Sequence, residues 1–252
     1  MQTEPAVLTA QAVLQAWDQA RGRHPLRQPL ELLCAAWPEL DADAWSALPL
    51  GVRDAHLLAL HESLFGTELD TVVDCPRCHV TLQTQISTAQ LRVAGSAASA
   101  GSGVLSLQVD DFELVFRLPS SDDLLAIDEA PDASPESEPA RLIERCVLSA
   151  RRSGTEIEPA DLPVMVLDRL QQEMARRDPG ADTTVTLTCP ACAHEFERGF
   201  DIGAYLWSEL SDWAGRTLDE VHTLASVYGW SEAQILGLSA ARRGDYIARV
   251  QG

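Results

Sequence analysis

The chain has 252 residues, six of them cysteine, and a formal net charge of −19 at pH 7. This length is enough for one large domain or two small ones. No stretch approaches the ~20 consecutive apolar residues that span a bilayer, and no basic region precedes an apolar one at the N-terminus, so we expect a cytoplasmic protein without membrane contact. The acidic surplus argues against nucleic-acid binding, because the phosphate backbone repels such a surface. Two interpretations of the surplus stay open, namely solubility alone and the steering of a basic protein partner.

Residues 1–66 are predicted to form an N-terminal helical region. Apolar residues recur at helical spacing in three segments, at positions 13–17, 30–37 and 50–65. His56 and His61 are five residues apart and do not have the order of an HExxH zinc-protease motif. We interpret both histidines as surface or packing residues.

After residue 66 the pattern changes from helical to alternating, and residues 67–93 are predicted to form the first zinc-ribbon hairpin. Cys75-Pro76-Arg77-Cys78 lies at its tip. Two thiolates separated by two residues are typical of half of a tetrahedral zinc site. His79 follows directly, but four thiolates saturate one zinc ion, so we expect this histidine outside the coordination shell.

Residues 94–182 are predicted to be an α/β insertion between the two halves of the metal site. Residues 94–103 are a flexible spacer by composition, and residues 129–140 form an acidic, proline-containing linker. Between them, alternating apolar residues over 105–118 indicate a β-hairpin, and Ser121 and Asp122 favour a helix start. Two more helices are expected, over 140–152 and from about 161 to 177.

Residues 183–201 repeat the arrangement of strand, cysteine pair and strand, with Cys189-Pro190-Ala191-Cys192 at the tip. A redox CxxC of the thioredoxin type belongs at a helix start, which neither pair has. We therefore expect one structural Zn²⁺ ion, with four ligands: Cys75, Cys78, Cys189 and Cys192. The two remaining cysteines, Cys34 and Cys146, lie in apolar helical patterns and are interpreted as small buried hydrophobes.

Residues 202–252 are predicted to form a C-terminal helical region. Ser231 and Gln234 fit a capping box, and Trp230 with Ile235 fits a hydrophobic staple. A basic trio ends the chain and is read as a solvated helix face, with a partner site as the alternative. Its members are Arg242, Arg243 and Arg249.

The predicted fold class is α+β, with helical terminal regions around a central zinc-ribbon pair of β-hairpins. A zinc ion with four thiolates has no open position for water, so its contribution is to folding and not to catalysis. We find no GxSxG, phosphate-loop, GxGxxG or HExxH motif, which disfavours an enzyme and leaves no catalytic residue to assign.

Several segments together resemble the baseplate hub assembly chaperone-like proteins of the T4-like baseplate family. These proteins are encoded with contractile phage tails and related contractile injection systems. The resemblance rests on the two CPxC hairpins and on further segments: Leu48-Pro49-Leu50-Gly51-Val52-Arg53-Asp54, Leu64-Phe65-Gly66, Phe116-Arg117-Leu118-Pro119, Asp122-Asp123-Leu124, His194, Tyr228-Gly229-Trp230-Ser231-Glu232, Arg242-Arg243 and Tyr246. It implies a non-catalytic role with baseplate, hub, spike or tube components as protein partners.

Three functional hypotheses follow. The leading one is an assembly chaperone or adaptor that a structural zinc ribbon stabilises. The alternative is a zinc-ribbon protein associated with nucleic acid, which predicts salt-sensitive binding to DNA or RNA and is disfavoured by the charge. The third is a hydrolase with a dispersed site, which would need histidines and carboxylates in a cleft near the metal.

Overall fold

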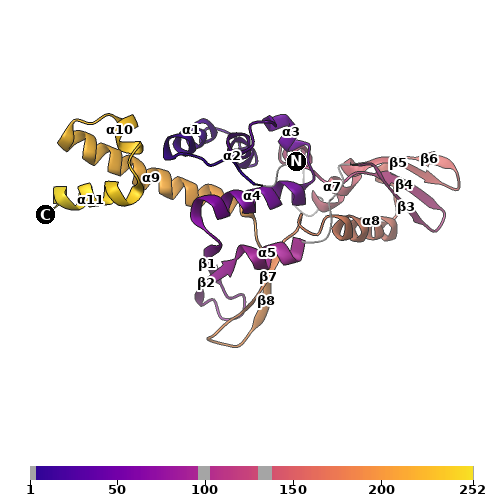
Figure 1. Cartoon of the computed structure of the whole chain (residues 1–252). Coiled ribbons are helices and arrows are strands. Elements are labelled where there is room, and N and C mark those ends of the chain that lie inside the picture. Colours follow the sequence, from indigo (N-terminus) through magenta and orange to yellow (C-terminus); the bar gives the residue numbers. More distant parts are fainter. Residues whose placement is uncertain (1–3, 96–102, 130–137, 252) are drawn as a thin grey trace. The chain divides into compact units, whose positions relative to one another are not determined.

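The computed structural model of the chain describes residues 4–95, 103–129 and 138–251. Helices and small antiparallel sheets make up the described residues, which confirms the α+β class (Figure 1). Most of the predicted spacer and most of the predicted acidic linker lie outside these residues. None of the helices in the described part combines the length and hydropathy that crossing a membrane requires.

The chain divides into two compact units. The terminal unit comprises residues 1–42 and 203–252, and the central unit comprises residues 43–202. Each has its own buried apolar side chains and is described by itself below.

The terminal unit brings helices from both ends of the chain together. They are α1 (Ala10–Ala20), α2 (Gln28–Ala36), α9 (Ile202–Tyr228), α10 (Glu232–Leu236) and α11 (Ala240–Gln251). On α1, Trp17 donates a hydrogen bond from Nε1 to Ser211 Oγ on α9 at 3.1 Å. The helices share a core of buried apolar residues: Leu14, Ala214, Val221, Leu224, Ile235 and Leu236.

The start of α10 confirms the capping box. Ser231 Oγ accepts from Gln234 N at 3.3 Å, and Gln234 Oε1 accepts from Ser231 N at 2.9 Å. Trp230 packs against the cluster that contains buried Ile235, as a hydrophobic staple requires. The N-terminus of α10 is therefore specified by residues that are close together in the sequence.

Arg243 departs from the predicted solvated basic face. Its residue is 3 % exposed, and its Nε donates to Glu220 Oε2 on α9 at 2.6 Å. It also donates from Nη1 to the Leu238 carbonyl at 2.9 Å. Arg242, one residue earlier, is exposed. The basic trio is therefore split, and Arg243 holds α11 to α9.

Replacing Arg243 with alanine is expected to lower the free energy of unfolding by about 2–3 kcal/mol, because Glu220 loses a charge-assisted hydrogen bond in a partly buried setting. Arg242→Ala is the matched control and should change that free energy by less than about 0.5 kcal/mol. Urea unfolding of both variants measures the difference. If both variants lost the same free energy of unfolding, the Arg243–Glu220 pair would not stabilise the fold.

The central unit combines helices with two antiparallel hairpins and a four-stranded sheet. In chain order they are α3 (Ala42–Ser46), α4 (Leu50–Phe65), β1 (Glu68–Asp74), β2 (Thr81–Ser87), α5 (Thr88–Gly95), β3 (Leu105–Val109), β4 (Phe112–Phe116), α6 (Ser121–Asp128), α7 (Glu138–Cys146), β5 (Val147–Arg152), β6 (Thr155–Ile157), the short 3₁₀ helix η2 (Pro159–Asp161), α8 (Val164–Arg177), β7 (Thr184–Thr188) and β8 (Glu195–Gly199). The strands form the antiparallel hairpin β1–β2, an antiparallel sheet of order β3-β4-β5-β6, and the antiparallel hairpin β7–β8. On α4, His56 and His61 are both buried, so of the two predicted environments they take the packed one.

The prediction of one helix over 140–152 is wrong, because α7 ends at Cys146 and residues 147–152 form strand β5. A register shift between Val115 and Phe116 leaves Leu148 without a partner on β4. The bulge turns Val147 and Ala150, three residues apart, into the core, while Leu148 is 50 % exposed. Buried residues therefore recur at helical spacing in a strand.

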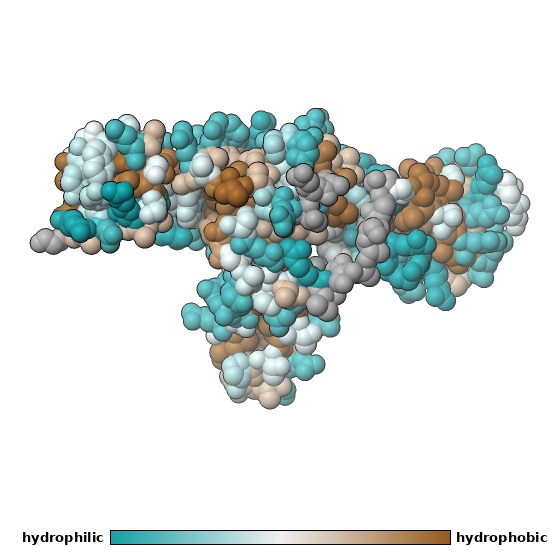
Figure 2. Space-filling model, viewed as in Figure 1, coloured by the Kyte–Doolittle hydropathy of each residue, from teal (hydrophilic) through white to brown (hydrophobic). Residues whose placement is uncertain are grey.

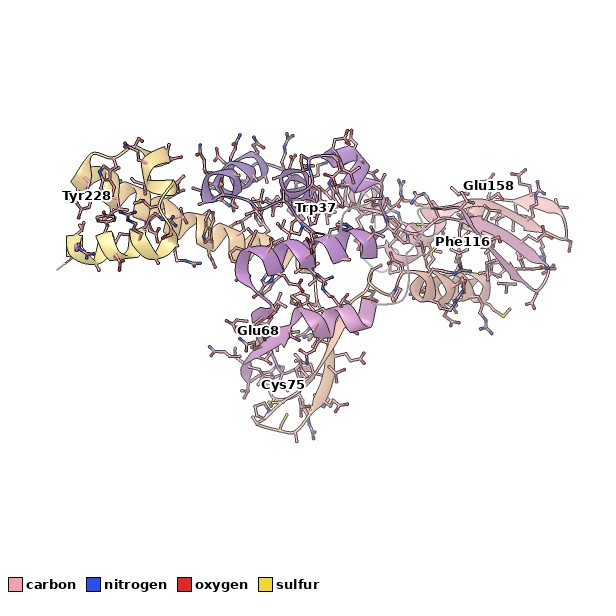
Figure 3. The ribbon with its side chains drawn as sticks, viewed as in Figure 1. Trp37, Glu68, Cys75, Phe116, Glu158 and Tyr228 are labelled. Atoms are coloured by element: carbon pink, nitrogen blue, oxygen red, sulfur yellow. The ribbon has the colours of Figure 1, made fainter. Side chains whose placement is uncertain are left out.

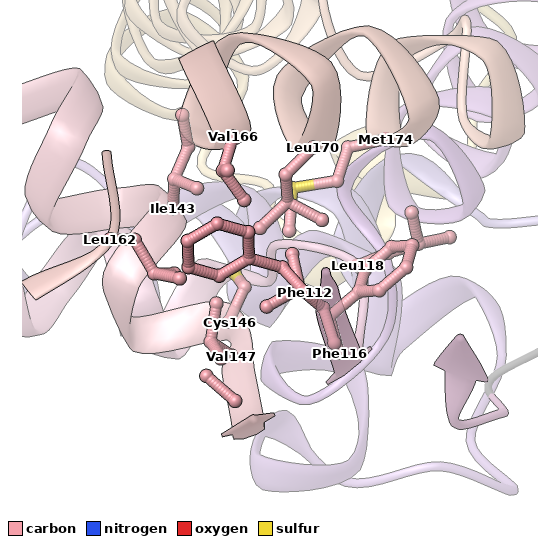
Figure 4. Packing of buried hydrophobic residues seen from close by; sticks show 12 residues of the cluster. Phe112, Phe116, Leu118, Ile143, Cys146, Val147, Leu162, Val166, Leu170 and Met174 are labelled. Carbon is pink, nitrogen blue, oxygen red and sulfur yellow. The ribbon is translucent and has the colours of Figure 1, made fainter. Parts of the chain in front are cut away.

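One face of the four-stranded sheet packs against α7 and α8. Figure 4 shows Phe112 and Phe116 of β4 among side chains of α8, including Val166 and Leu170. Cys146 belongs to the same cluster and is completely buried, as its sequence setting predicted. Burial raises the pKa of the Cys146 thiol to about 12, so this thiol stays neutral.

Candidate metal centre

The four predicted zinc ligands come together, although more than a hundred residues separate the two pairs. Cys75 Sγ lies 3.8 Å from Cys192 Sγ, and Cys78 Sγ lies 3.6 Å from Cys189 Sγ. All four sulfurs lie within 4.8 Å of one another. Four sulfurs bound to one zinc ion at roughly 2.3 Å would be about 3.8 Å apart, whereas a disulfide bond is about 2.05 Å long. The spacing fits a shared tetrahedral ion and not a disulfide.

The two cysteine pairs form the same local turn. In the first, Cys75 O accepts from His79 N at 2.9 Å and Cys75 N donates to Val80 O at 3.0 Å. In the second, Cys189 makes the equivalent bonds with Ala193 and His194, at 2.8 and 2.9 Å.

The residue after each pair has a left-handed backbone, with φ of 57° at His79 and 55° at Ala193. This conformation disfavours residues that carry a Cβ atom, and the chain adopts it at the same point of both turns. The repetition shows that each turn is shaped to direct two sulfurs to one side.

The hairpins that carry the turns have little core of their own. Leu82 of β2 and Phe196 of β8 are buried with Cys75 and Cys189, and Val73 is half-buried against them. Cys75 lies at the end of its hairpin away from Glu68, the first residue of β1 (Figure 3). Two-stranded hairpins are marginally stable alone, so a metal crosslink would supply what this small cluster lacks.

The two thiols of the first pair, Cys75 and Cys78, have pKa values that are shifted in opposite directions. Burial opposes ionisation of Cys75, but the backbone N–H groups of Cys78 and Arg77 outweigh it and lower the pKa of Cys75 to about 6. At Cys78 the backbone N–H of Val80 favours the thiolate, yet burial and the neighbouring sulfurs raise its pKa to about 12. Four thiolates this close would repel one another unless a cation lay between them.

The first hairpin is anchored to α4. Arg92 on α5 donates from Nε and Nη2 to the two carboxylate oxygens of Glu62 on α4, at 3.1 and 3.0 Å. At the base of the hairpin, Thr88 N donates to Thr67 O at 2.8 Å. α5 also contacts β7, so it connects the two hairpins.

The second hairpin is positioned through a close backbone approach. Asp178, at the end of α8, is buried and accepts from Gly51 N in the first turn of α4 at 3.0 Å. A Cβ atom at Gly180 would lie 3.2 Å from Gly51 Cα. This contact fixes the segment that leads into β7 against the helix that leads into β1.

Gly51→Ala is expected to destabilise the chain by about 1–3 kcal/mol, because the added Cβ would collide with the Asp178 side chain and come within 3.0 Å of Ala181 N. Gly215→Ala in α9 is the control, since no heavy atom lies within 4 Å of a Cβ atom there. It should stabilise the helix by up to about 1 kcal/mol. Thermal unfolding of both variants tests this, and a Gly51→Ala protein as stable as the parent would contradict the close approach.

Two of the segments that carry the family resemblance meet directly. Leu50 N donates to Pro119 O at 3.0 Å, and Pro49 pairs with Ser120 in an isolated antiparallel bridge. Arg53 is buried and donates from Nη1 to Ser121 Oγ at 2.9 Å. Residues 48–54 and 116–124 therefore form one structural unit at the start of α4 and α6.

A buried carboxylate lies at the centre of this unit. Asp123 accepts from Arg117 Nη1 and Nη2 at 2.5 and 2.7 Å, from Arg145 Nε at 3.3 Å and from Ser120 N at 3.1 Å. Burial opposes its ionisation, but these partners lower the pKa of Asp123 below its usual value. Ser120 and Asp123 also form the capping box of α6. The sequence prediction names Ser121 and Asp122 as the helix start instead, although the Ser120-x-x-Asp123 spacing is a recognisable signal.

Two further residues singled out in the sequence are not members of the four-sulfur group. Cys34 is half-buried, and burial together with Glu31 and Asp41 raises the pKa of its thiol to about 11. His194 stacks on Phe196 with ring centroids 5.9 Å apart. Among the residues that the structure describes, the group close enough to share a metal ion consists of the four cysteines.

Comparison with known proteins gives one match. No curated protein and no solved structure matches the chain. The sequence model of the family described as T4 bacteriophage base plate protein matches residues 34–202, about two thirds of the chain. This range contains both cysteine pairs and the unit formed by residues 48–54 and 116–124, whereas the C-terminal resemblance segments lie beyond it. The chain therefore belongs to the T4 bacteriophage base plate protein family.

Proposed function

We propose that this chain is a non-catalytic assembly chaperone or adaptor for the baseplate or hub of a contractile tail-like particle. The family match over residues 34–202 is the observation that carries this proposal, because it indicates a phage baseplate role and contacts with other phage proteins. The chain would act in the cytoplasm, where such particles assemble and where cysteines stay reduced.

One structural Zn²⁺ ion is the second part of the proposal, with Cys75, Cys78, Cys189 and Cys192 as its ligands. The distances among the sulfurs support a single tetrahedral ion. Four thiolates would fill its coordination sphere, so the ion would close a loop of more than a hundred residues and would not activate water.

Charge supports protein partners over nucleic acid. The net charge is −19, and Figure 2 shows hydrophilic side chains over much of the visible face, with smaller hydrophobic patches between them. Nucleic-acid binding draws most of its affinity from basic side chains on phosphates. A protein partner with a basic surface fits this chain better.

Affinity capture tests the proposal. The tagged full chain is expressed in cells that produce the particle, and the proteins that co-purify after nuclease treatment are identified by mass spectrometry. We expect baseplate, hub, spike or tube subunits. Recovery of polymerase or ribosomal components instead, or of no particle subunit, would contradict the assembly role.

A further inference from the structure

The central unit contains a pocket of ≈ 690 Å³ at the meeting point of its distant segments. Its walls come from the start of α4, from α6 and α7, from the end of α8, and from the bases of β7 and β8. Most of its exposed lining is apolar, and the contributing side chains include Leu124, Leu142, Met174, Ala175 and Phe200. A hollow of this size and character is typical of a site that receives an apolar group.

The ionisable side chains that line this pocket are mostly acidic. Among the described residues that line it, the ionisable ones are Arg53 and four aspartates: Asp54, Asp178, Asp182 and Asp201. Arg53 is 8 % exposed and already donates to Asp54 Oδ1 at 2.7 Å and to Ser121 Oγ at 2.9 Å. Its charge is therefore engaged inside the protein, and the four aspartates give the lining of the pocket a net negative charge.

The carboxylates disfavour one another's charge. Burial raises the pKa of Asp54 despite the adjacent Arg53, and Asp201 and Asp178 raise it further. Burial also raises the pKa of Asp178, against the hydrogen bond from Gly51 and the charge of Arg53. A cation entering the pocket would relieve this repulsion, and an anion would add to it.

We propose that this pocket binds a segment of a partner protein in which an apolar side chain is flanked by lysine or arginine. The apolar side chain would enter between Leu124, Met174 and Phe200, and the basic group would reach Asp182 and Asp201 at the rim. An apolar anchor in a pocket with charged groups at its edge is the usual source of affinity in such contacts. The proposal rests on the assembly role, since it specifies the chemistry of the partner.

A displayed library of random peptides, selected on the immobilised full chain, tests this pocket. We expect enrichment of peptides that pair Leu, Ile, Met or Phe with Lys or Arg. Ala175→Trp, which fills the pocket, and Asp182→Lys, which reverses a rim charge, should each weaken binding of the enriched peptides by about tenfold or more in fluorescence anisotropy.

Two matched variants control for the size and charge of these changes. Gln172→Trp and Asp168→Lys lie on exposed positions of α8 that do not line the pocket, and they should leave peptide affinity within about twofold. Thermal unfolding checks that all four variants keep the parent fold. The proposal would be overturned if the enriched peptides bound the pocket variants with the same affinity as the parent. It would also be overturned if the selection enriched acidic peptides, or if it enriched no peptide at all.

Crosslinking adds a positional readout. The chain contains 19 arginines and no lysine, so a carbodiimide that joins carboxylates to amines has no lysine within this chain to react with. Crosslinks from lysine-containing peptides should map to Asp182 or Asp201, and crosslinks confined to other carboxylates would contradict the site. If the pocket variants still capture particle subunits from cells as the parent does, the pocket assignment fails while the assembly role stands. If the parent captures none, the assembly role itself fails.

Discussion

Cys75→Ser is expected to abolish stoichiometric zinc binding and to lower the free energy of unfolding of the central unit by more than about 4 kcal/mol. Structural zinc contributes its binding free energy directly to folding, and loss of a metal is among the few changes that exceed the usual range for one substitution. Cys189→Ser should have the same effect, because the proposed site takes two of its four ligands from each hairpin. Metal analysis of the purified protein and urea unfolding measure both quantities.

Cys34→Ser is the matched control for this prediction. It makes the same change of sulfur to oxygen at a half-buried thiol that lies outside the four-sulfur group. The variant should retain its full zinc content and lose less than about 1 kcal/mol. A Cys75→Ser protein that equals the parent in stability, or that keeps one zinc ion per chain, would contradict a shared structural site.

Asp123→Asn is expected to cost about 1.5–3 kcal/mol, because it removes charge-assisted hydrogen bonds to a completely buried carboxylate, while Arg117 and Arg145 remain 36 % and 44 % exposed and keep part of their hydration. The loss should appear as a lower midpoint in urea unfolding. Glu129→Gln removes a carboxylate charge at the exposed residue that follows the same helix; it is the control and should change stability by less than about 0.5 kcal/mol.

The same carboxylate predicts a pH dependence. The folded-state pKa of Asp123 lies below the unfolded value of about 3.9, so its contribution is fully present above that pH. The contribution is lost as the pH falls through the lowered folded-state pKa, because protonation then costs more in the folded state than in the unfolded chain. Asp123→Asn should therefore lose less stability than the parent as the pH falls below about 4. If the free energy of unfolding fell equally with pH in the two proteins, Asp123 would not be the cause of the pH dependence.

The sequence predicts the cluster of four cysteines better than it predicts the insertion. Each cysteine pair carries a complete local signal, namely alternating strands around a CPxC turn, so both hairpins and their tips are recognisable. Their meeting is predictable because half a tetrahedral site is incomplete alone. The capping box of Ser231 and Gln234 follows in the same way from residues three apart. For α6 the prediction names Ser121 and Asp122, whereas Ser120 and Asp123 form the capping box.

The features that sequence reasoning missed depend on distant partners. Residues 147–152 pair with β4 through a bulge, and the resulting spacing of buried residues copies a helix. Gly51 and Gly180 are far apart in the sequence, but their backbones approach closely in the structure. No local sequence pattern identifies a glycine that is needed for such a close approach. Arg243 is indistinguishable from Arg242 until Glu220 lies beside it. Tertiary contacts decide each of these cases.

Zinc X-ray absorption on the purified full chain tests the central claim most directly. We expect one zinc ion per chain, surrounded by four sulfur atoms at roughly 2.3 Å. A first shell containing nitrogen or oxygen ligands, or a chain that folds with no stoichiometric metal, would contradict the account.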